Sequence, residues 1–257
     1  MSSTATDYSL ITRNLKKSLL LAAGQPDVKR ASDYYLAKIS TIKSIDAFLG
    51  NDRVYQYAMK AFGLDEMIYA KAFLRKVLTE GVDKSDSFAN KLSDHRFKEF
   101  ATAFNFARYG GTATTFSRTQ QGTVDKYVRQ TLEGNAGETN EGVRLALYFQ
   151  RTAPGIATPL SLLADKALLK VTQVALELPA SSGALNIDKQ VELIKKKLDV
   201  ADFKDPVKLE KFLKRFAALW DIDNSNSQSS PTVLLGKQTM GLDVNILSLL
   251  QTIKTGR

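Results

Sequence analysis

Apolar residues recur at every third or fourth position along most of the chain, a spacing that places them on one face of an α-helix. The pattern is clearest in four stretches, which read Val54, Tyr57, Ala58, Ala61 and Phe62; Phe97, Phe100, Ala101 and Phe104; Leu168, Val171, Val174 and Ala175; and Leu209, Phe212, Leu213, Phe216 and Leu219. The alternation of apolar and polar residues that indicates β-strands is rare. The sequence therefore predicts an all-α protein.

A residue suited to the N-cap of a helix precedes each stretch. Aligning the stretches places Ser44, Ser87 and Thr158 at equivalent positions, and Asp205 joins them with a slip of one or two residues. Their side-chain oxygens can accept from the free N–H groups of a first helical turn. A proline directly follows the last two, where its fixed φ suits that turn. We therefore expect a compact bundle of repeated helix-loop-helix units.

Each repeat also begins with another predicted helix. In one copy its apolar face consists of Met67, Ala70, Phe73, Leu74, Val77 and Leu78. A polar loop over residues 80–86 separates this helix from the next cap. In the third copy the segment Val143–Phe149 is apolar almost all round, which predicts a central buried helix.

These patterns divide the chain into four parts. Residues 1–27 are predicted to form a mobile polar tail and a helix that Gly24-Gln25-Pro26 ends. Residues 28–222 form the helical repeat core. Residues 223–231 have the composition of a polar linker, and residues 232–257 contain a last amphipathic helix.

Two segments that depart from the repeat are the candidate interaction surfaces. Residues 107–123 are rich in glycine and threonine and predict a long loop, in which Phe116 is an anchor and Tyr109 and Arg118 are candidate contacts. The C-terminal helix would present three candidate contacts on its apolar side, Leu242, Ile246 and Leu250. A tethered amphipathic helix can dock on its own core or lie in a partner's groove.

The composition excludes several classes of protein. The 257 residues include no cysteine, so disulfides, thiolate nucleophiles and thiolate metal ligands are ruled out. No apolar stretch approaches the roughly 18–20 residues of a membrane-spanning helix. The apolar run Leu19–Ala23 is too short for a secretory signal. We expect neither membrane insertion nor export by the general secretory route.

The formal net charge of +9 raises the question of a nucleic-acid partner. The basic residues are spread along the chain, which favours a solvated surface over a binding footprint. Arg53 and Arg96 lie near helix starts, but Asp52 and Asp94 beside them would repel phosphate. Nucleic acid is therefore an alternative partner and not the favoured one.

Catalytic and cofactor motifs are not evident. The sequence has neither a dinucleotide-binding glycine fingerprint nor a P-loop, and its single histidine, His95, lacks a predicted partner. Asp94 is adjacent to His95, but neighbours on a helix do not face each other. We interpret His95 as a surface residue near a helix start. We assign no catalytic, cofactor-binding or metal-binding residue.

Six blocks of the sequence resemble a known family. They are Ser44–Leu49, Met59–Leu64, Tyr69–Phe73, Ser87–Leu92, Gly122–Tyr127 and Leu162–Leu168. In these blocks the chain resembles an alphaproteobacterial family, domain of unknown function 1217, from about Tyr8 to Ile222. Members are commonly encoded among flagellar genes, and the family has no agreed catalytic residues.

The resemblance implies a non-enzymatic structural or interaction protein associated with the bacterial flagellum. Its expected partners are proteins, flagellar components first among them, and no cofactor is expected. The resemblance implies a place in the cytoplasm or export through the flagellar apparatus. Two alternatives stay open: a cytoplasmic nucleic-acid-binding helical module, and an enzyme whose site the sequence does not reveal.

Overall fold

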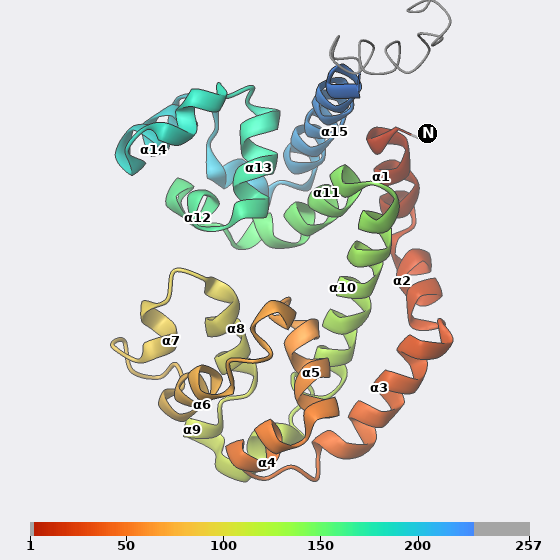
Figure 1. Cartoon of the computed structure of the whole chain (residues 1–257), viewed down its shortest axis with the longest axis vertical. Coiled ribbons are helices and arrows are strands. Elements are labelled where there is room, and N and C mark those ends of the chain that lie inside the picture. Colours follow the sequence, from red (N-terminus) through yellow and green to blue (C-terminus); the bar gives the residue numbers. More distant parts are fainter. Residues whose placement is uncertain (1–2, 229–257) are drawn as a thin grey trace, which may run out of the picture.

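The computed structural model describes residues 3–228, which fold into α-helices and short 3₁₀-helices with no strand among them (Figure 1). The all-α prediction is confirmed for this part of the chain. None of the helices within it is long and apolar enough to cross a bilayer. The α-helices are α1 (Thr4–Arg13), α2 (Leu15–Ala23), α3 (Pro26–Ile39), α4 (Ile45–Gly50), α5 (Asp52–Ala61), α6 (Lys71–Glu80), α7 (Phe88–Lys91), α8 (His95–Ala103), α9 (Phe106–Tyr109), α10 (Gln121–Thr139), α11 (Glu141–Thr152), α12 (Pro159–Ala164), α13 (Lys166–Ala175), α14 (Ile187–Lys197) and α15 (Pro206–Gln228). The 3₁₀-helices are η1 (Asp65–Met67), η2 (Gly110–Thr115), η3 (Ala153–Gly155), η4 (Ala180–Ala184) and η5 (Val200–Lys204).

The repeating unit contains two caps where the sequence pattern predicts one. A short helix follows the first cap, and a second cap then begins the longer helix, as in α4 and α5 or α12 and α13. Asn51, Asp94 and Asp165 are the second caps, and each accepts from a backbone N–H of the helix it starts. By element order Asp205 corresponds to these residues, because η5 takes the place of the short helix. Asp205 is therefore equivalent to the second cap, Asn51, and not to the first cap, Ser44, as predicted.

The described residues have two large hydrophobic cores, and both include residues of the predicted repeat core 28–222. The first includes Phe48 and Phe100, and the second includes Phe149 and Phe216. We call residues 15–132 the first lobe, and residues 3–13 together with 136–228 the second lobe. Helix α10 runs from one lobe to the other, because Val128 packs in the first core while Ala136 packs against the second (Figure 1).

The predicted polar tail is helical from Thr4 onward. Ser3 caps α1 by accepting from the Thr6 backbone N–H at 3.2 Å. The Thr4 N–H donates to Asp221 at 3.1 Å, and Tyr8 is buried in the second core. Contacts far along the chain thus fix a segment whose own composition suggests a tail. The predicted stop at Gly24-Gln25-Pro26 is confirmed, since α2 ends at Ala23 and α3 begins at Pro26.

Helix α11 is buried at the centre of the second lobe, as the run Val143–Phe149 predicts. Gly142 on this helix permits its close approach to α15. A Cβ atom there would lie 2.5 Å from Trp220 Cδ1, a separation that real side chains do not adopt. This glycine therefore sets how near the two helices can pack.

Residues 107–123 do not form one long loop. They contain the end of α9, all of η2 and the start of α10. The buried Thr114 hydroxyl donates to the Ile42 carbonyl at 2.7 Å, and the Thr119 hydroxyl donates to the Ala113 carbonyl at 3.0 Å. Such hydrogen bonds let threonines occupy tight turns inside the protein.

The predicted linker at residues 223–231 is also wrong in part, because α15 continues to Gln228. Extending an existing helix costs little even through Asn and Ser, since the unfavourable step is nucleation. Residues 229–231 and the predicted C-terminal helix over 232–257, with Leu242, Ile246 and Leu250, lie outside the described residues.

Candidate functional site

A cleft of about 1310 Å³ lies between the two lobes, and residues of both lobes line it. Helix α8, Arg118 and the first turns of α10 form the wall on the first lobe. Helices α12, α13 and α14 form the wall on the second lobe. The first wall is charged and the second is apolar, so the cleft is chemically two-sided.

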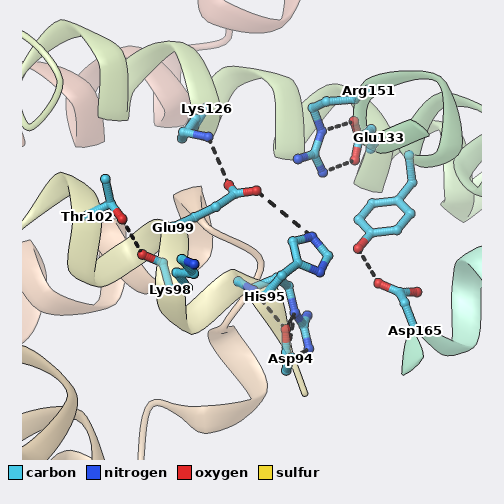
Figure 2. Close-up of polar contacts among 11 residues, drawn as sticks. Asp94, His95, Lys98, Glu99, Thr102, Lys126, Glu133, Arg151 and Asp165 are labelled. Carbon is cyan, nitrogen blue, oxygen red and sulfur yellow. Dashed lines mark hydrogen bonds and ion pairs between the residues drawn. The ribbon is translucent and has the colours of Figure 1, made fainter. Parts of the chain in front are cut away.

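The charged wall follows from the helical period of α8. His95, Lys98, Glu99 and Thr102 share one face, while Phe97, Phe100 and Ala101 on the opposite face enter the first lobe. Glu99 Oε2 lies 3.4 Å from Lys126 Nζ on α10, and Glu99 Oε1 lies 3.9 Å from His95 Nε2 (Figure 2). Glu99 is therefore the central carboxylate of this wall, with Lys126 near one oxygen and His95 near the other.

The apolar wall consists of aliphatic side chains from three short helices and one loop. They are Ile156, Leu160, Leu163, Leu168, Leu169 and Ile187. Leu160 is 53% exposed and Ile187 is 60% exposed. These two side chains extend the apolar surface from the core of the second lobe out into the cleft.

Asp94 and Arg96 fix the start of α8 at the edge of the cleft. Asp94 accepts from the Arg96 backbone N–H at 3.0 Å and from Arg96 Nη2 at 2.7 Å, and Arg96 Nη1 donates to the Gly63 carbonyl. Burial by itself would raise the pKa of Asp94, but the hydrogen bonds and charge of Arg96 outweigh it and hold that pKa below its ordinary value. The pair ties the start of α8 to the end of α5.

This pair makes stability depend on pH. A carboxyl whose pKa is lower in the folded state stabilises the fold above its unfolded pKa, and this contribution is lost as the pH falls through the folded pKa. We expect Asp94→Asn to lower the free energy of unfolding by about 1 kcal/mol at neutral pH, because asparagine still caps but carries no charge. The difference from the wild type should shrink below about pH 4, measured by urea unfolding at several pH values. An equal difference at every pH would contradict the charge argument, and the exposed Asp52→Asn is the control.

A largely buried ion cluster joins α10 to α11 beside the cleft, which one of its members, Arg151, also lines. Glu133 Oε1 is 2.9 Å from Arg129 Nε. It is also 2.9 Å from Arg151 Nε, and Glu133 Oε2 accepts from Arg151 Nη2 at 3.0 Å (Figure 2). Arg129 also donates to the Leu147 carbonyl at 2.9 Å. The Glu133 side chain is only 3% exposed, so the cluster is a structural joint between α10 and α11.

Tyr148 and Asp165 form a second polar contact beside this cluster. The Tyr148 hydroxyl donates to Asp165 Oδ2 at 2.5 Å, and the Arg151 guanidinium lies 5.1 Å from the Tyr148 ring centre. Burial, followed by the negative charge of Asp165, raises the pKa of Tyr148 above its ordinary value. Tyr148 is therefore a neutral donor that holds the cap of α13.

The polar groups of the cleft are mostly charged side chains. The His95–Glu99 separation of 3.9 Å is too long for a hydrogen bond, and Glu99 also faces Lys126. The described part of the chain holds no group of three or more histidine, aspartate or glutamate side chains placed to bind a metal ion. What the walls offer a ligand is a set of cations opposite an apolar surface.

The structure brings together three of the predicted contact residues. The rings of Tyr109 and Phe116 are 4.9 Å apart, and the Arg118 guanidinium lies 4.4 Å from the Phe116 ring centre. Arg118 also lines the cleft, whereas the two rings pack at the edge of the first lobe. His95 is partly exposed at the first position of α8, as interpreted from the sequence.

Sequence reasoning missed the residues of the apolar wall and three of the four cations, Lys98, Lys126 and Arg151. The polar face of α8 could have been found, because His95, Lys98, Glu99 and Thr102 have helical spacing. No sequence signal pairs this face with α12–α14, since that pairing depends on how the two lobes meet.

Fold and cleft together define a two-lobed, all-α protein with a cleft between its lobes. Residues 61–209 match the family described as "Protein of unknown function (DUF1217)", and the chain belongs to this family. All residues that line the cleft fall within the matched range. The match confirms the resemblance.

A solved structure supports the fold. The X-ray crystal structure of a structural-genomics target protein from Agrobacterium tumefaciens is 46% identical in sequence and has a TM-score of 0.80. The similarity covers 87% of this chain and 97% of the Agrobacterium chain. The comparison with curated proteins gave no match.

Proposed function

We propose that this protein is a non-enzymatic interaction protein that binds a protein partner in the cleft between its lobes. The exposed apolar wall carries the proposal. Apolar side chains such as Leu160 and Ile187, grouped in a concave site and facing polar groups, are typical of interaction surfaces. The cleft volume of about 1310 Å³ also exceeds the roughly 300–1,000 Å³ of small-molecule pockets.

The proposed setting is the bacterial flagellum. The family supports this setting, because its members are commonly encoded among flagellar genes. A structural or interaction role agrees with walls that offer cations and apolar surface. The partner would then be a component of the flagellar apparatus.

Crosslinking from the cleft in motile cells tests this function. A photo-crosslinking amino acid at position 160 should form an adduct with a flagellar protein, whereas one at the exposed Val207 on α15 should not. Deletion of the gene should impair swimming or filament assembly. Normal swimming together with no position-specific adduct would refute the proposal.

A nucleic acid is the alternative partner, because Lys98, Arg118 and Lys126 lie on one wall and could contact phosphates. It predicts association with DNA or RNA whose affinity falls steeply with salt, because binding releases counterions. An electrophoretic shift at low salt that Lys98→Glu abolishes would replace the protein-partner proposal.

A further inference from the structure

The lining of the cleft as a whole has an excess of positive charge. Four cationic side chains line the cleft, namely Lys98, Arg118, Lys126 and Arg151, against the single carboxylate of Glu99. Arg151 is neutralised by Glu133, and Lys126 shares Glu99 with His95. Lys98 and Arg118 have no carboxylate within ion-pair distance among the described residues. The wall therefore favours a ligand that carries negative charge.

The apolar wall favours a helix. Strand addition needs a sheet edge, whereas an amphipathic helix docks by laying its apolar face in a hydrophobic groove. The described part of the chain has no strand, so it offers no sheet edge for the first mode. A helix is roughly 10–12 Å across, so a cleft of this volume accommodates about two to three turns.

We propose that the segment bound in the cleft is an amphipathic helix with an acidic polar face. Its apolar face lies against Leu160, Leu163 and Ile187, and its carboxylates lie against Lys98 and Arg118. This deepens the proposed function and rests on it.

Charge argues against the chain's own C-terminal segment as the occupant. Residues 232–257 carry Lys237, Lys254 and Arg257 against one acidic residue, Asp243. A basic segment would bring like charges together beside Lys98 and Arg118. An acidic partner helix fits the same apolar wall and neutralises the cations.

A designed peptide tests the inference directly on the full-length protein. The probe is a fluorescein-labelled helix of about five turns, with leucines on one face and glutamates on the other. One comparison peptide has lysine in place of every glutamate, and another has the same composition in scrambled order. Fluorescence anisotropy should show saturable binding of the acidic amphipathic peptide, weakened by salt, and at least about tenfold weaker binding of both comparison peptides.

Matched variants locate the binding. Lys98→Glu and Leu160→Asp should each weaken the acidic peptide by about tenfold or more. Lys91→Glu on α7 and Val207→Asp on α15, which are exposed but outside the cleft, should leave its affinity unchanged. Circular dichroism and thermal midpoints equal to those of the wild type show that the variants are folded.

Three results would overturn the inference. The first is equal binding of the acidic and lysine peptides, and the second is equal weakening by Lys98→Glu and Lys91→Glu. The third is a gain in peptide affinity on Ile246→Asp, which would assign the cleft to the C-terminal segment. If the peptide fails while position 160 still crosslinks to a flagellar protein, the acidic-helix inference falls and the proposed function stands. If the peptide binds but no such adduct forms in cells, the proposal of a flagellar partner is refuted and the acidic-helix inference stands.

Discussion

Glu133→Gln is expected to lower the free energy of unfolding by about 3–5 kcal/mol. Glutamine has nearly the same shape but leaves the buried Arg129 and the partly buried Arg151 without their shared carboxylate. The cost comes from two desolvated guanidinium groups that lose their counterion. Urea unfolding followed by circular dichroism measures the change, and the slope with denaturant should stay the same.

The surface pair of Glu99 and Lys126 provides the control. Glu99 is 49% exposed, so water screens its charge, and Glu99→Gln should cost no more than about 1 kcal/mol. Similar losses for both variants would show that Glu133 is not the desolvated joint that the structure indicates. Full recovery of stability in a triple variant, Glu133→Leu with Arg129→Met and Arg151→Met, would show that apolar packing can replace the cluster.

Phe48→Ala is expected to lower the free energy of unfolding by about 3–5 kcal/mol as well, through a cavity in the first core. Phe48 is fully buried, and its ring lies 5.0 Å from the ring of Phe104 and 6.1 Å from that of Phe100. These contacts come from α4 and α8, so the surrounding helices cannot close the space without moving. Phe48→Leu keeps most of the volume and should lose distinctly less.

Phe48→Ala also tests whether the two lobes unfold together. Trp220 on α15 is the one tryptophan of the sequence and lies in the second lobe. Because α10 packs in both cores, a cavity in the first lobe should shift the tryptophan fluorescence transition and the circular dichroism transition together. A fluorescence midpoint that stays at the wild-type value would mean that the lobes unfold independently.

Helix composition and helix starts could be predicted locally. Phe97, Phe100 and Ala101 form the buried face of α8, and Phe104 is buried directly after its end. Ser44 accepts from the Ala47 N–H at 3.1 Å, as an N-cap does. Both signals act within one or two helical turns, so neighbouring residues contain all the information needed. The same holds for the stop at Gly24-Gln25-Pro26.

Local reasoning failed where distant contacts decide the outcome. Residues 4–7 look like a tail, yet Thr4 bonds to Asn140 and Asp221 from the far end of the chain. Asn51, Asp94 and Asp165 are short polar residues like many others, and only the structure shows that each starts a helix. Periodicity predicts a buried face but does not say which core that face enters.

By itself the sequence determined an all-α chain with capped helices in repeated order and an ordinary polar face on α8. The tertiary structure decided that the helices divide into two lobes and that α10 bridges them. It also decided that Lys98 and Arg118 line one side of a cleft and that Leu160 and Ile187 line the other. The reason is that helical periodicity acts over a few residues, whereas a cleft depends on packing between elements that lie dozens of residues apart in the sequence.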